Sequence, residues 1–499
     1  MALQATVRTP RFKVFAITRN VGELFEADLD GSVLEVVTQK RMGDPAGSFR
    51  ITLAPRRPPA KFFSEKWTDI FSPMDYVEIL ARVPPRPWRV VMRGWLDTVG
   101  ETFSIESGQP QHQVLLAGRD YGKIVLMSKL WYPHETVPQT LTILQRWADG
   151  FHRTSGPGVG VIPDVFPGDT GSTPSGSFFR PQEYMRAIYD AFYSPQEEAV
   201  VDSFPSAGGA IPRSRMVTFP ADPWEQELAA YNPLFSMQSW TPFTDVWTLF
   251  RSYQNLPWHE LYFVDEATEP HLVFRQAPWL DFDGAEVQEW PPNMVVHDID
   301  EGALRMERQV FRSDAEVKNL FFTSGFFTGS FFQLIMQMPR ALEGMFAPPP
   351  FRNNPYLIGL QGTDGDDPRL KPSVYQRFGF RQHTVATPYL SIERGLAEGP
   401  LQERVAALRL QGADGNRRLV RAFGHAEYLE AGTYKIPGDE RLMIGDYLRT
   451  LTSRSYMYVA GLLQQMRQGT AASDGHFWST IEFVRGRMYI DRASQVETR

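Results

Sequence analysis

The stretch of residues 76–126 constrains the fold of this chain most strongly. Val77, Ile79 and Ala81 alternate with other side chains, and this period of two predicts a half-buried β-strand. Prolines at positions 84, 85 and 87 follow and end the strand, because proline cannot donate to the hydrogen bonds of a sheet. Two further apolar runs, 88–98 and 114–117, flank a polar segment. The stretch therefore predicts an antiparallel β-meander.

The composition indicates several domains built from short elements. A chain of 499 residues, 42% of them hydrophobic, can bury more than one core. It contains 39 glycines and 39 prolines, and such frequent breaks favour short strands over long helices.

Charge and cysteine content narrow the classes of function. The net charge of −7 lacks the concentrated basic surface of nucleic-acid binders, so specific nucleic-acid readout is not expected. No apolar run approaches the roughly 18 residues that a spanning helix needs, so stable membrane insertion is not expected. The chain has no cysteine, which removes disulfides, thiolate metal sites and cysteine nucleophiles.

Strand patterns also precede the meander. Residues 12–17, 33–38 and 49–54 each form an apolar or alternating run between turn-rich segments. Many short strands in one region pack most simply as a small barrel or a strongly curved sheet. We therefore expect residues 1–126 to form a first tube-like antiparallel β-barrel domain.

The pattern changes in residues 127–294, which we expect to form an α+β middle domain. Tyr184, Ile188 and Phe192 have the four-residue spacing of a helix. A second helix is predicted to start at Thr244, whose hydroxyl suits an N-cap. Two strands are predicted at 261–264 and 272–274.

Strands return in residues 295–324 and 426–490, which predict a second tube-like β-barrel domain. Within it, 432–436 and 441–444 are predicted to pair as a hairpin across the turn residues Pro437 and Gly438. The intervening residues 325–425 are rich in Phe, Met and Pro and have a predicted helix at 400–411, so we expect a helical insertion in the second barrel. The predicted fold class is a β-rich α+β multidomain protein.

The two ends of the chain echo each other. Gly94 and Gly118 flank one polar segment, and Gly461 and Gly486 flank another at almost the same separation. Arginine follows the second glycine of each pair, and an Asp-Tyr dipeptide starts the preceding strand in both copies, at 75–76 and 446–447. These matches predict two related β domains in which Gly118 and Gly486 occupy equivalent corners.

The polar segments 98–112 and 466–475 hold matching places in the two copies. We interpret both as long loops. The hypotheses for them are docking to a partner, lining of a channel, or simple exposure as turns.

The sequence contains no recognisable catalytic constellation. The nine histidines are scattered and none forms a His-Glu-x-x-His motif. A Gly-x-Ser-x-Gly elbow is also absent. Asp364, Asp366 and Asp367 lie among glycines but lack the closing acidic residue of a calcium loop. We therefore expect no enzyme, and we assign no catalytic, cofactor-binding or metal residues and no cofactor.

Several ordered segments resemble one family, the central baseplate hub proteins of contractile phage tails. This family includes late-control-protein-D-like hubs and the hub part of type VI secretion spike proteins. Each motif alone is weak, but they follow the family's order over most of the chain. The segments are Met74-Asp-Tyr-Val-Glu-Ile, Arg93-Gly-Trp-Leu-Asp, Gly118-Arg-Asp-Tyr-Gly-Lys, Pro257-Trp-His-Glu-Leu-Tyr-Phe-Val-Asp, Arg312-Ser-Asp-Ala-Glu-Val-Lys-Asn and the region from Pro437-Gly438 to Gly445-Asp446-Tyr447.

The resemblance implies a structural virion protein, a homotrimer whose two barrels per chain form a pseudo-hexameric ring. Such a hub joins the hexameric tail tube to the trimeric central spike, and tape measure and baseplate wedge proteins are further implied partners. Its implied location is the tail baseplate of the virion, after assembly in the host cytoplasm. The insertion at 325–425 departs from a minimal hub, and its role, the host and the exact partners do not follow from the sequence.

Two other functions remain open from the sequence alone. The first is a tail-associated hydrolase of polysaccharide or peptidoglycan, in which Trp224, Trp240 and Trp247 would line a sugar groove beside a carboxylate pair. The second is a carbohydrate-binding module at the tail tip, without catalysis.

Overall fold

A computed structural model describes most of the predicted strands of the chain. The residues described are 11–18, 25–29, 31–54, 58, 66–106, 109–128, 185–186, 189–204, 211–218, 245–254, 256–279, 295–299, 307–318, 320–325, 378, 381–387, 418–419, 421–423, 429–450, 455–467 and 476–488.

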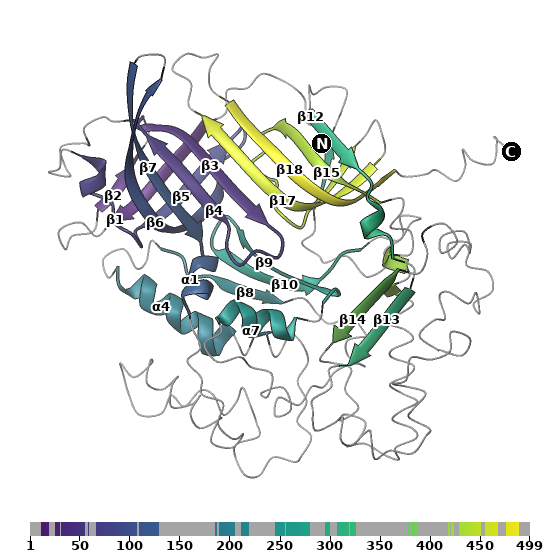
Figure 1. Cartoon of the computed structure of the whole chain (residues 1–499). Coiled ribbons are helices and arrows are strands. Elements are labelled where there is room, and N and C mark those ends of the chain that lie inside the picture. The colour runs from purple at the N-terminus through teal and green to yellow at the C-terminus, as the bar shows by residue number, and fades with distance from the viewer. Residues whose placement is uncertain are drawn as a thin grey trace, which may run out of the picture.

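One large sheet, antiparallel except for one strand pair, dominates the described structure (Figure 1). Among the described residues it has 13 strands. Its N-terminal part contains β1 (Arg11–Thr18), β2 (Phe25–Asp28), β3 (Val33–Arg41), β4 (Ser48–Leu53), β5 (Tyr76–Arg82), β6 (Arg89–Glu106) and β7 (Gln109–Asp120). Its C-terminal part contains β11 (Val296–Ile299), β12 (Glu307–Phe311), β15 (Glu430–Pro437), β16 (Tyr447–Thr450), β17 (Ser455–Arg467) and β18 (His476–Met488).

The two parts of the sheet meet where β3 pairs with β17. The strand order is β12-β15-β18-β17-β3-β4-β7-β6-β5-β1-β2, with β16 beside β17 and β11 beside β16. Strands from the two ends of the chain therefore share one continuous hydrogen-bonded sheet.

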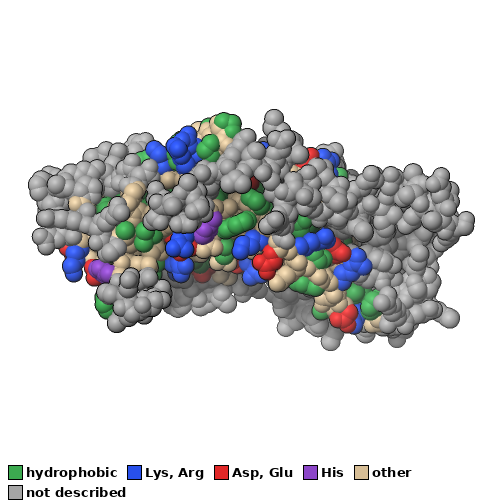
Figure 2. All heavy atoms as spheres, turned by 90° about the horizontal axis from the view of Figure 1, so that it is seen from above, with side chains coloured by type: hydrophobic (Ala, Val, Ile, Leu, Met, Phe, Trp, Pro, Cys, Tyr) green, Lys and Arg blue, Asp and Glu red, His purple; other side chains and the backbone are tan. Residues whose placement is uncertain are grey.

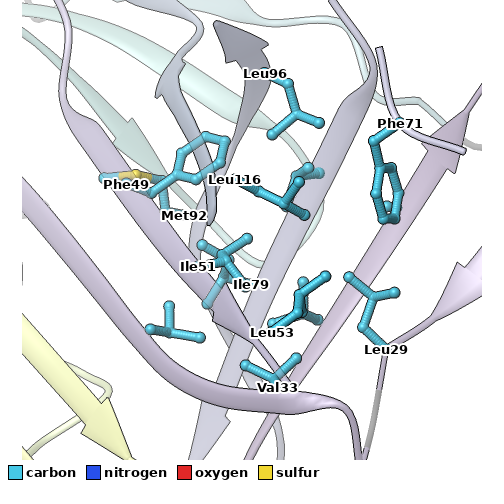
Figure 3. Close-up of a cluster of buried hydrophobic side chains, with 14 of the residues drawn as sticks. Leu29, Val33, Phe49, Ile51, Leu53, Phe71, Ile79, Met92, Leu96 and Leu116 are labelled. Atoms are coloured by element: carbon cyan, nitrogen blue, oxygen red, sulfur yellow. The ribbon is translucent and has the colours of Figure 1, made fainter. Parts of the chain in front are cut away.

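Alternating burial along the strands gives each part its own core. In the first core, Ile51, Ile79 and Leu116 are fully buried on β4, β5 and β7 (Figure 3). The 3₁₀ helix η3 (Trp67–Asp69) adds Trp67 to this core. Truncating such an isoleucine to alanine typically costs about 2–5 kcal/mol, through lost burial and the cavity left behind.

The second core lies on the C-terminal part of the sheet. Ile436, Leu448 and Ile481 are fully buried there, on β15, β16 and β18. Tyr262 and Val264 of the middle region pack into the same cluster. The middle region therefore helps to complete the second core.

A smaller layer lies beneath the large sheet in Figure 1. In its three-stranded sheet, β10 (Pro270–Gln276) lies between β8 (Arg215–Thr218) and β9 (His259–Asp265). The helical elements are α1 (Gly122–Met127), η4 (Tyr189–Tyr193), α4 (Ser194–Asp202) and α7 (Val246–Tyr253). Every residue of β9 is buried, because this strand is covered on both faces.

A two-stranded parallel sheet of β13 (Leu320–Gly325) and β14 (Gln382–Thr387) lies outside the large sheet. It follows the 3₁₀ helix η6 (Asp314–Glu316). The strands expected in residues 295–324 are thus divided: β11 and β12 join the large sheet, whereas β13 pairs with β14.

The expectation of a β-rich fold with large antiparallel sheets is confirmed. The expected strand at 441–444 is wrong, since these residues form turns. The carboxylates of Asp439 and Asp446 accept hydrogen bonds from the backbone N–H groups of Arg441 and Met443, which favours turns over a ladder. The predicted cap Thr244 lies outside the described residues, and Asp245 caps α7 by accepting from Thr248 N at 2.7 Å.

The polar segment 98–112 is not a loop, contrary to expectation. β6 and β7 continue through it as a hairpin, paired from Thr98 and Ala117 to Glu106 and Gln109. The predicted helix at 400–411 and the Asp364 to Asp367 cluster lie outside the described residues.

Candidate functional site

The described residues gather no catalytic constellation of the kinds considered above. No group of three or more His, Asp or Glu side chains in this part of the chain could hold a metal ion. Trp247 is buried on α7, so it cannot line an open sugar groove, and Trp224 and Trp240 lie outside the described ranges. No helix in the described part is long and apolar enough to cross a membrane. The features with functional content are therefore strand edges and junctions.

Two groups of five strands have the same topology. In chain order, the first β unit is β3, β4, β5, β6 and β7, and the second β unit is β12, β15, β16, β17 and β18. In space the two orders are β3-β4-β7-β6-β5 and β12-β15-β18-β17-β16. Chain order and spatial order thus match strand by strand, which the echo in the sequence indicated.

The corner before the fifth spatial strand is also repeated. Asp75 Oδ2 accepts from Ser72 N at 2.8 Å, and Asp446 Oδ2 accepts from Met443 N at 3.1 Å. Each aspartate accepts through its backbone carbonyl from the neighbouring long strand, from Leu96 N and Val459 N, both at 2.9 Å. Leu96 and Val459 are therefore equivalent positions.

The register after these positions extends the equivalence. A β-bulge lies between Leu96 and Thr98 in β6, and a bulge lies between Val459 and Gly461 in β17. Thr98 is therefore equivalent to Gly461. The prediction that Gly118 and Gly486 occupy equivalent corners is wrong: Leu96 pairs with Gly118, whereas Val459 pairs with Phe483.

Beyond each bulge the long strands form an arm. The N-terminal arm consists of 98–106 of β6 with 109–117 of β7, and the C-terminal arm consists of 461–467 of β17 with 476–482 of β18. The C-terminal arm docks on the first β unit, because Gly461 to Arg467 pair antiparallel with Arg41 to Glu35 of β3. Met466 and Phe477 of this arm are 1% and 5% exposed and belong to the first core.

Polar contacts reinforce this docking. Gln465 Nε2 donates to Glu35 Oε1 at 2.6 Å, and Arg41 Nη2 lies 2.5 Å from Glu482 Oε1. Exposed ion pairs such as the second one contribute little, about 0–1 kcal/mol. Backbone pairing and the buried Met466 and Phe477 therefore carry most of the junction.

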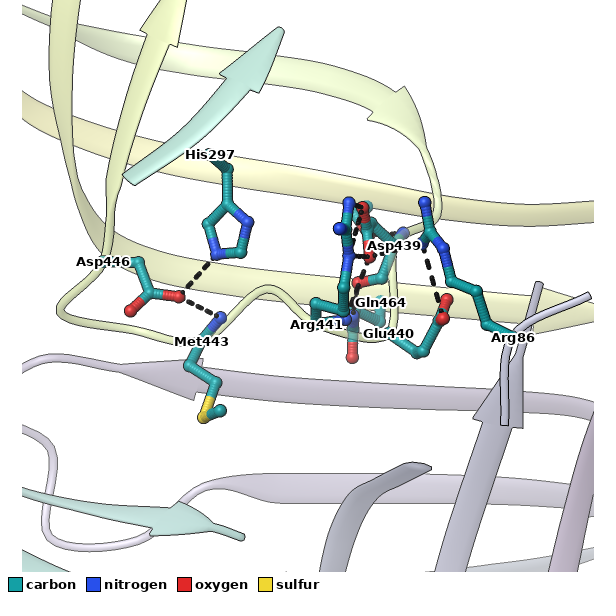
Figure 4. Close-up of polar contacts among 9 residues, drawn as sticks. Arg86, His297, Asp439, Glu440, Arg441, Met443, Asp446 and Gln464 are labelled. Carbon is teal, nitrogen blue, oxygen red and sulfur yellow. Dashed lines mark hydrogen bonds and ion pairs between the residues drawn. The ribbon is translucent and has the colours of Figure 1, made fainter. Parts of the chain in front are cut away.

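The turn between β5 and β6 touches the second β unit near the same arm (Figure 4). Arg86 Nη1 donates to Asp439 Oδ1 at 3.0 Å and lies 3.4 Å from Glu440 Oε1. Arg441 also binds the Asp439 carboxylate, at 2.5 Å through Nη2. Burial raises the pKa of Asp439, but hydrogen bonds from Arg441 outweigh it and hold that pKa below its usual value. The carboxylate is thus an anion that joins the two units.

A buried charge cluster fixes the middle region to the first β unit. Lys40 Nζ on β3 lies 2.7 Å from Asp265 Oδ2 at the end of β9 and 3.2 Å from Asp120 Oδ2 at the end of β7. Burial lowers the pKa of Lys40, but the two carboxylates outweigh this effect and raise it above its usual value. Burial raises the pKa of Asp120. The lysine is a structural cation shared by three strands.

Two arginines attach the β9–β10 hairpin to both β units. Arg93 on β6 donates to the carbonyls of Glu266 and Ala267, at 2.6 and 2.9 Å. Arg275 on β10 donates to the Gly445 carbonyl at 2.6 Å. The hairpin thus contacts both units, β6 in the first and the corner at Gly445 in the second.

Both sides of the β3–β17 junction have exposed counterparts: the N-terminal arm corresponds to the C-terminal arm, and β12 corresponds to β3. Among the described residues, no strand pairs with 98–106 on the side away from β7, and β12 pairs on one side alone, with β15. Phe103 on the arm is 67% exposed and Phe311 on β12 is 58% exposed. Figure 1 places the arm and β12 toward opposite ends of the large sheet.

The face seen from above in Figure 2 carries mixed charge. Lys and Arg side chains lie among Asp and Glu side chains on the described part of this face, with hydrophobic side chains between them. Such a mixture suits contact with another protein surface more than with a polyanion.

No protein-family model matches the chain, and no curated protein matches it. Three solved structures similar to it are two tail proteins and a VgrG complex. The tail protein from Neisseria meningitidis MC58 is 10% identical with a TM-score of 0.42, covering 95% of this chain and 96% of that chain. The 43 kDa tail protein of prophage MuSo2 from Shewanella oneidensis is 10% identical with a TM-score of 0.39, covering 96% and 97%. The lidded Francisella PdpA-VgrG complex is 7% identical with a TM-score of 0.38, covering 97% of this chain and 53% of that chain.

Proposed function

We propose that this chain is a structural hub of a phage tail baseplate and acts as a homotrimer. Three copies would present six β units in one ring and match the hexameric tail tube on one side and the trimeric central spike on the other. The proposal includes two tube-like units per chain and a location in the virion tail.

One observation carries the proposal: two β units of the same strand order share a continuous sheet through the β3–β17 junction. A chain that places two similar units edge to edge already contains one of the contacts that a ring needs. If the same contact recurs between chains, n chains give a ring of 2n similar units. Three chains then give near-sixfold symmetry. The resemblance of the ordered motifs to those of hub proteins supports three as the number of chains in the ring.

The buried contacts of the middle region support the proposal, because they make the connection between the two β units rigid. Lys40, Arg93 and Arg275 tie the β9–β10 hairpin to both β units through buried or half-buried charge-assisted hydrogen bonds. Such bonds are about twice as strong as neutral ones and fix orientation. The two units are thereby held at a set angle, which a symmetry adaptor requires.

The mass of the assembled protein tests the proposal. The full chain is measured by mass photometry alone and with its tail tube and central spike proteins, and rings are viewed by negative-stain electron microscopy. We expect trimers with near-sixfold projections. Stable monomers or dimers under all these conditions would refute the hub.

We further propose that the chain is not an enzyme and that any lytic activity of the tail resides on another chain. The buried position of Trp247 gives the sugar-groove alternative no support. Release of soluble fragments from purified peptidoglycan or capsular polysaccharide by the isolated chain would contradict this proposal.

A further inference from the structure

We propose that the N-terminal arm of one chain adds to the exposed edge of β12 in a second copy, with the register of the β3–β17 junction. This inference rests on the proposed function and names the surface through which the copies meet. It follows from the repeated topology, because each side of the intrachain junction has an unpaired equivalent elsewhere in the described part of the same chain.

The donor side of the junction is repeated in the N-terminal arm. Counting from the aligned bulges, Gln465 of the C-terminal arm corresponds to Thr102, and Met466 corresponds to Phe103. Met466 is 1% exposed in the first core, whereas Phe103 is 67% exposed. The N-terminal arm therefore carries, in solvent, the apolar residue that its counterpart buries.

The acceptor side of the junction is repeated in β12. Val37 on β3 lies opposite Arg50, and Gln309 on β12 lies opposite Thr433. Phe49 pairs with Gly118, and Gly432 pairs with its equivalent Phe483, so Phe49 and Gly432 are equivalent. Arg50 and Thr433 each follow by one residue and are therefore equivalent as well. Gln309 is therefore the counterpart of Val37.

These equivalences give the register between two chains. Inside the chain, Gln465 pairs with Val37, so Thr102 of one copy lies opposite Gln309 of the next. Moving two residues along each strand, Gly100 lies opposite Phe311. A Cβ on Gly100 would have nothing within 4 Å among the described atoms, so the exposed Phe311 ring has open space to cover that glycine.

A second copy of the chain fits this edge better than a different partner. β-strand addition uses backbone groups that any edge offers, but the arm and β12 match each other through a junction that the fold already builds once. The arm and β12 lie toward opposite ends of the sheet (Figure 1), so the contact is head-to-tail. Head-to-tail contacts close into rings when the rotation permits.

Disulfide trapping tests the register, since the natural chain has no cysteine. The test variant is Thr102→Cys with Gln309→Cys, which places two thiols opposite each other between chains. Directly opposed residues have Cα atoms about 4.5–5.5 Å apart, within disulfide range. The matched positive control is Val37→Cys with Gln465→Cys, the same pair inside one chain. The negative control is Thr98→Cys with Glu307→Cys, six residues out of register and so about 20 Å apart.

After mild oxidation, we expect covalent oligomers from the test variant on a denaturing gel, with the 102–309 disulfide identified by mass spectrometry. The positive control should form an intrachain bridge, and the negative control should remain uncrosslinked. If the wild type assembles and the positive control forms its disulfide, but the test variant stays uncrosslinked, the proposed interface is wrong. The proposed hub function is not contradicted by that result. Crosslinking of the test variant into open chains in place of closed trimers would support the interface and refute the trimeric hub.

Discussion

Met74 and Gly445 occupy the same left-handed corner of the two β units, with φ of 71° and 87°. Each precedes the aspartate that caps the corner, and each backbone N–H donates to the equivalent long strand, to Leu96 O at 2.8 Å and Val459 O at 2.9 Å. A side chain is tolerated in the first unit, although left-handed backbone costs about 1–2 kcal/mol for a residue other than glycine. In the second unit, the β9–β10 hairpin fills the space that a side chain would need.

The change Gly445→Ala should therefore destabilise the protein strongly. The new Cβ would lie 2.5 Å from the Tyr262 hydroxyl and 2.6 Å from Arg275 Nη2, in addition to the left-handed strain. We expect a loss of about 2–4 kcal/mol in the free energy of unfolding by urea. Gly31→Ala is the control, because Gly31 has φ of 85° and no described atom within 4 Å of a Cβ. Equal losses for the two variants would refute the steric explanation.

Removing the buried cation at Lys40 should lower the free energy of unfolding more than removing an exposed cation. Lys40→Met leaves the Asp120 and Asp265 carboxylates buried without their partner, and such a loss typically costs about 3–5 kcal/mol. The folded pKa of Lys40 is raised, so its stabilisation is fully present below its unfolded pKa and is lost only as the pH rises through the folded pKa.

The loss of unfolding free energy caused by Lys40→Met should become smaller as the pH falls from 8 toward 5, because the unpaired carboxylates then bind protons. Urea unfolding at both pH values measures this change. The exposed Lys66→Met, whose ion pair with Glu101 spans 3.8 Å, is the control and should change stability by less than about 0.5 kcal/mol. A deficit independent of pH would contradict the role of the carboxylates.

Glu197 on α4 should make stability fall between pH 4.5 and 7. Burial raises its pKa to about 7, although its Oε1 accepts from Ser214 N at 2.6 Å. A carboxyl whose folded pKa is raised contributes stability below its unfolded pKa and loses it as the pH rises through the folded value. The predicted loss is about 3 kcal/mol across this window.

Glu197→Gln removes the titration and should flatten the profile of unfolding free energy over pH 4.5–7. Its exposed neighbour provides the control: Glu198→Gln should keep the wild-type slope. Identical slopes for the wild type and Glu197→Gln would show that this carboxyl titrates normally.

Phe103→Lys should abolish assembly without unfolding the chain. Phe103 is exposed in the single chain, so the substitution should change monomer stability by less than about 0.5 kcal/mol. In the proposed register, residue 103 lies opposite Arg308 of the next copy, so the new ammonium group would face a like charge across the two strands, which is destabilising. Mass photometry should show monomers. Met127→Lys changes another exposed apolar residue, on α1, and should leave assembly intact; loss of assembly in both variants would exclude a specific role for Phe103.

The amino-acid sequence by itself determined where most strands lie and where the fold repeats. Val77, Ile79 and Ala81 alternate in the sequence and are all fully buried on β5, because a period of two is a local property of an extended chain. The Asp-Tyr dipeptides marked the repeated corner correctly, since a short acidic side chain that caps its own turn is also a local signal. The glycine pairs misled, because Gly94 lies two residues before Leu96 whereas Gly461 lies two residues after Val459. An equal spacing along the chain does not fix the register in which strands pair.

Only the tertiary structure decided how the strands join and which surfaces stay open. The pairing of β3 with β17 links residues more than 400 positions apart, and no local pattern encodes such a partner. The β6 half of the N-terminal arm resembles a loop in the sequence. Thr98, Glu101, Thr102 and Phe103 are all exposed in the single chain, so this stretch lacks the alternation that reveals a strand. A strand whose buried face belongs to another copy of the chain gives little signal in its own sequence.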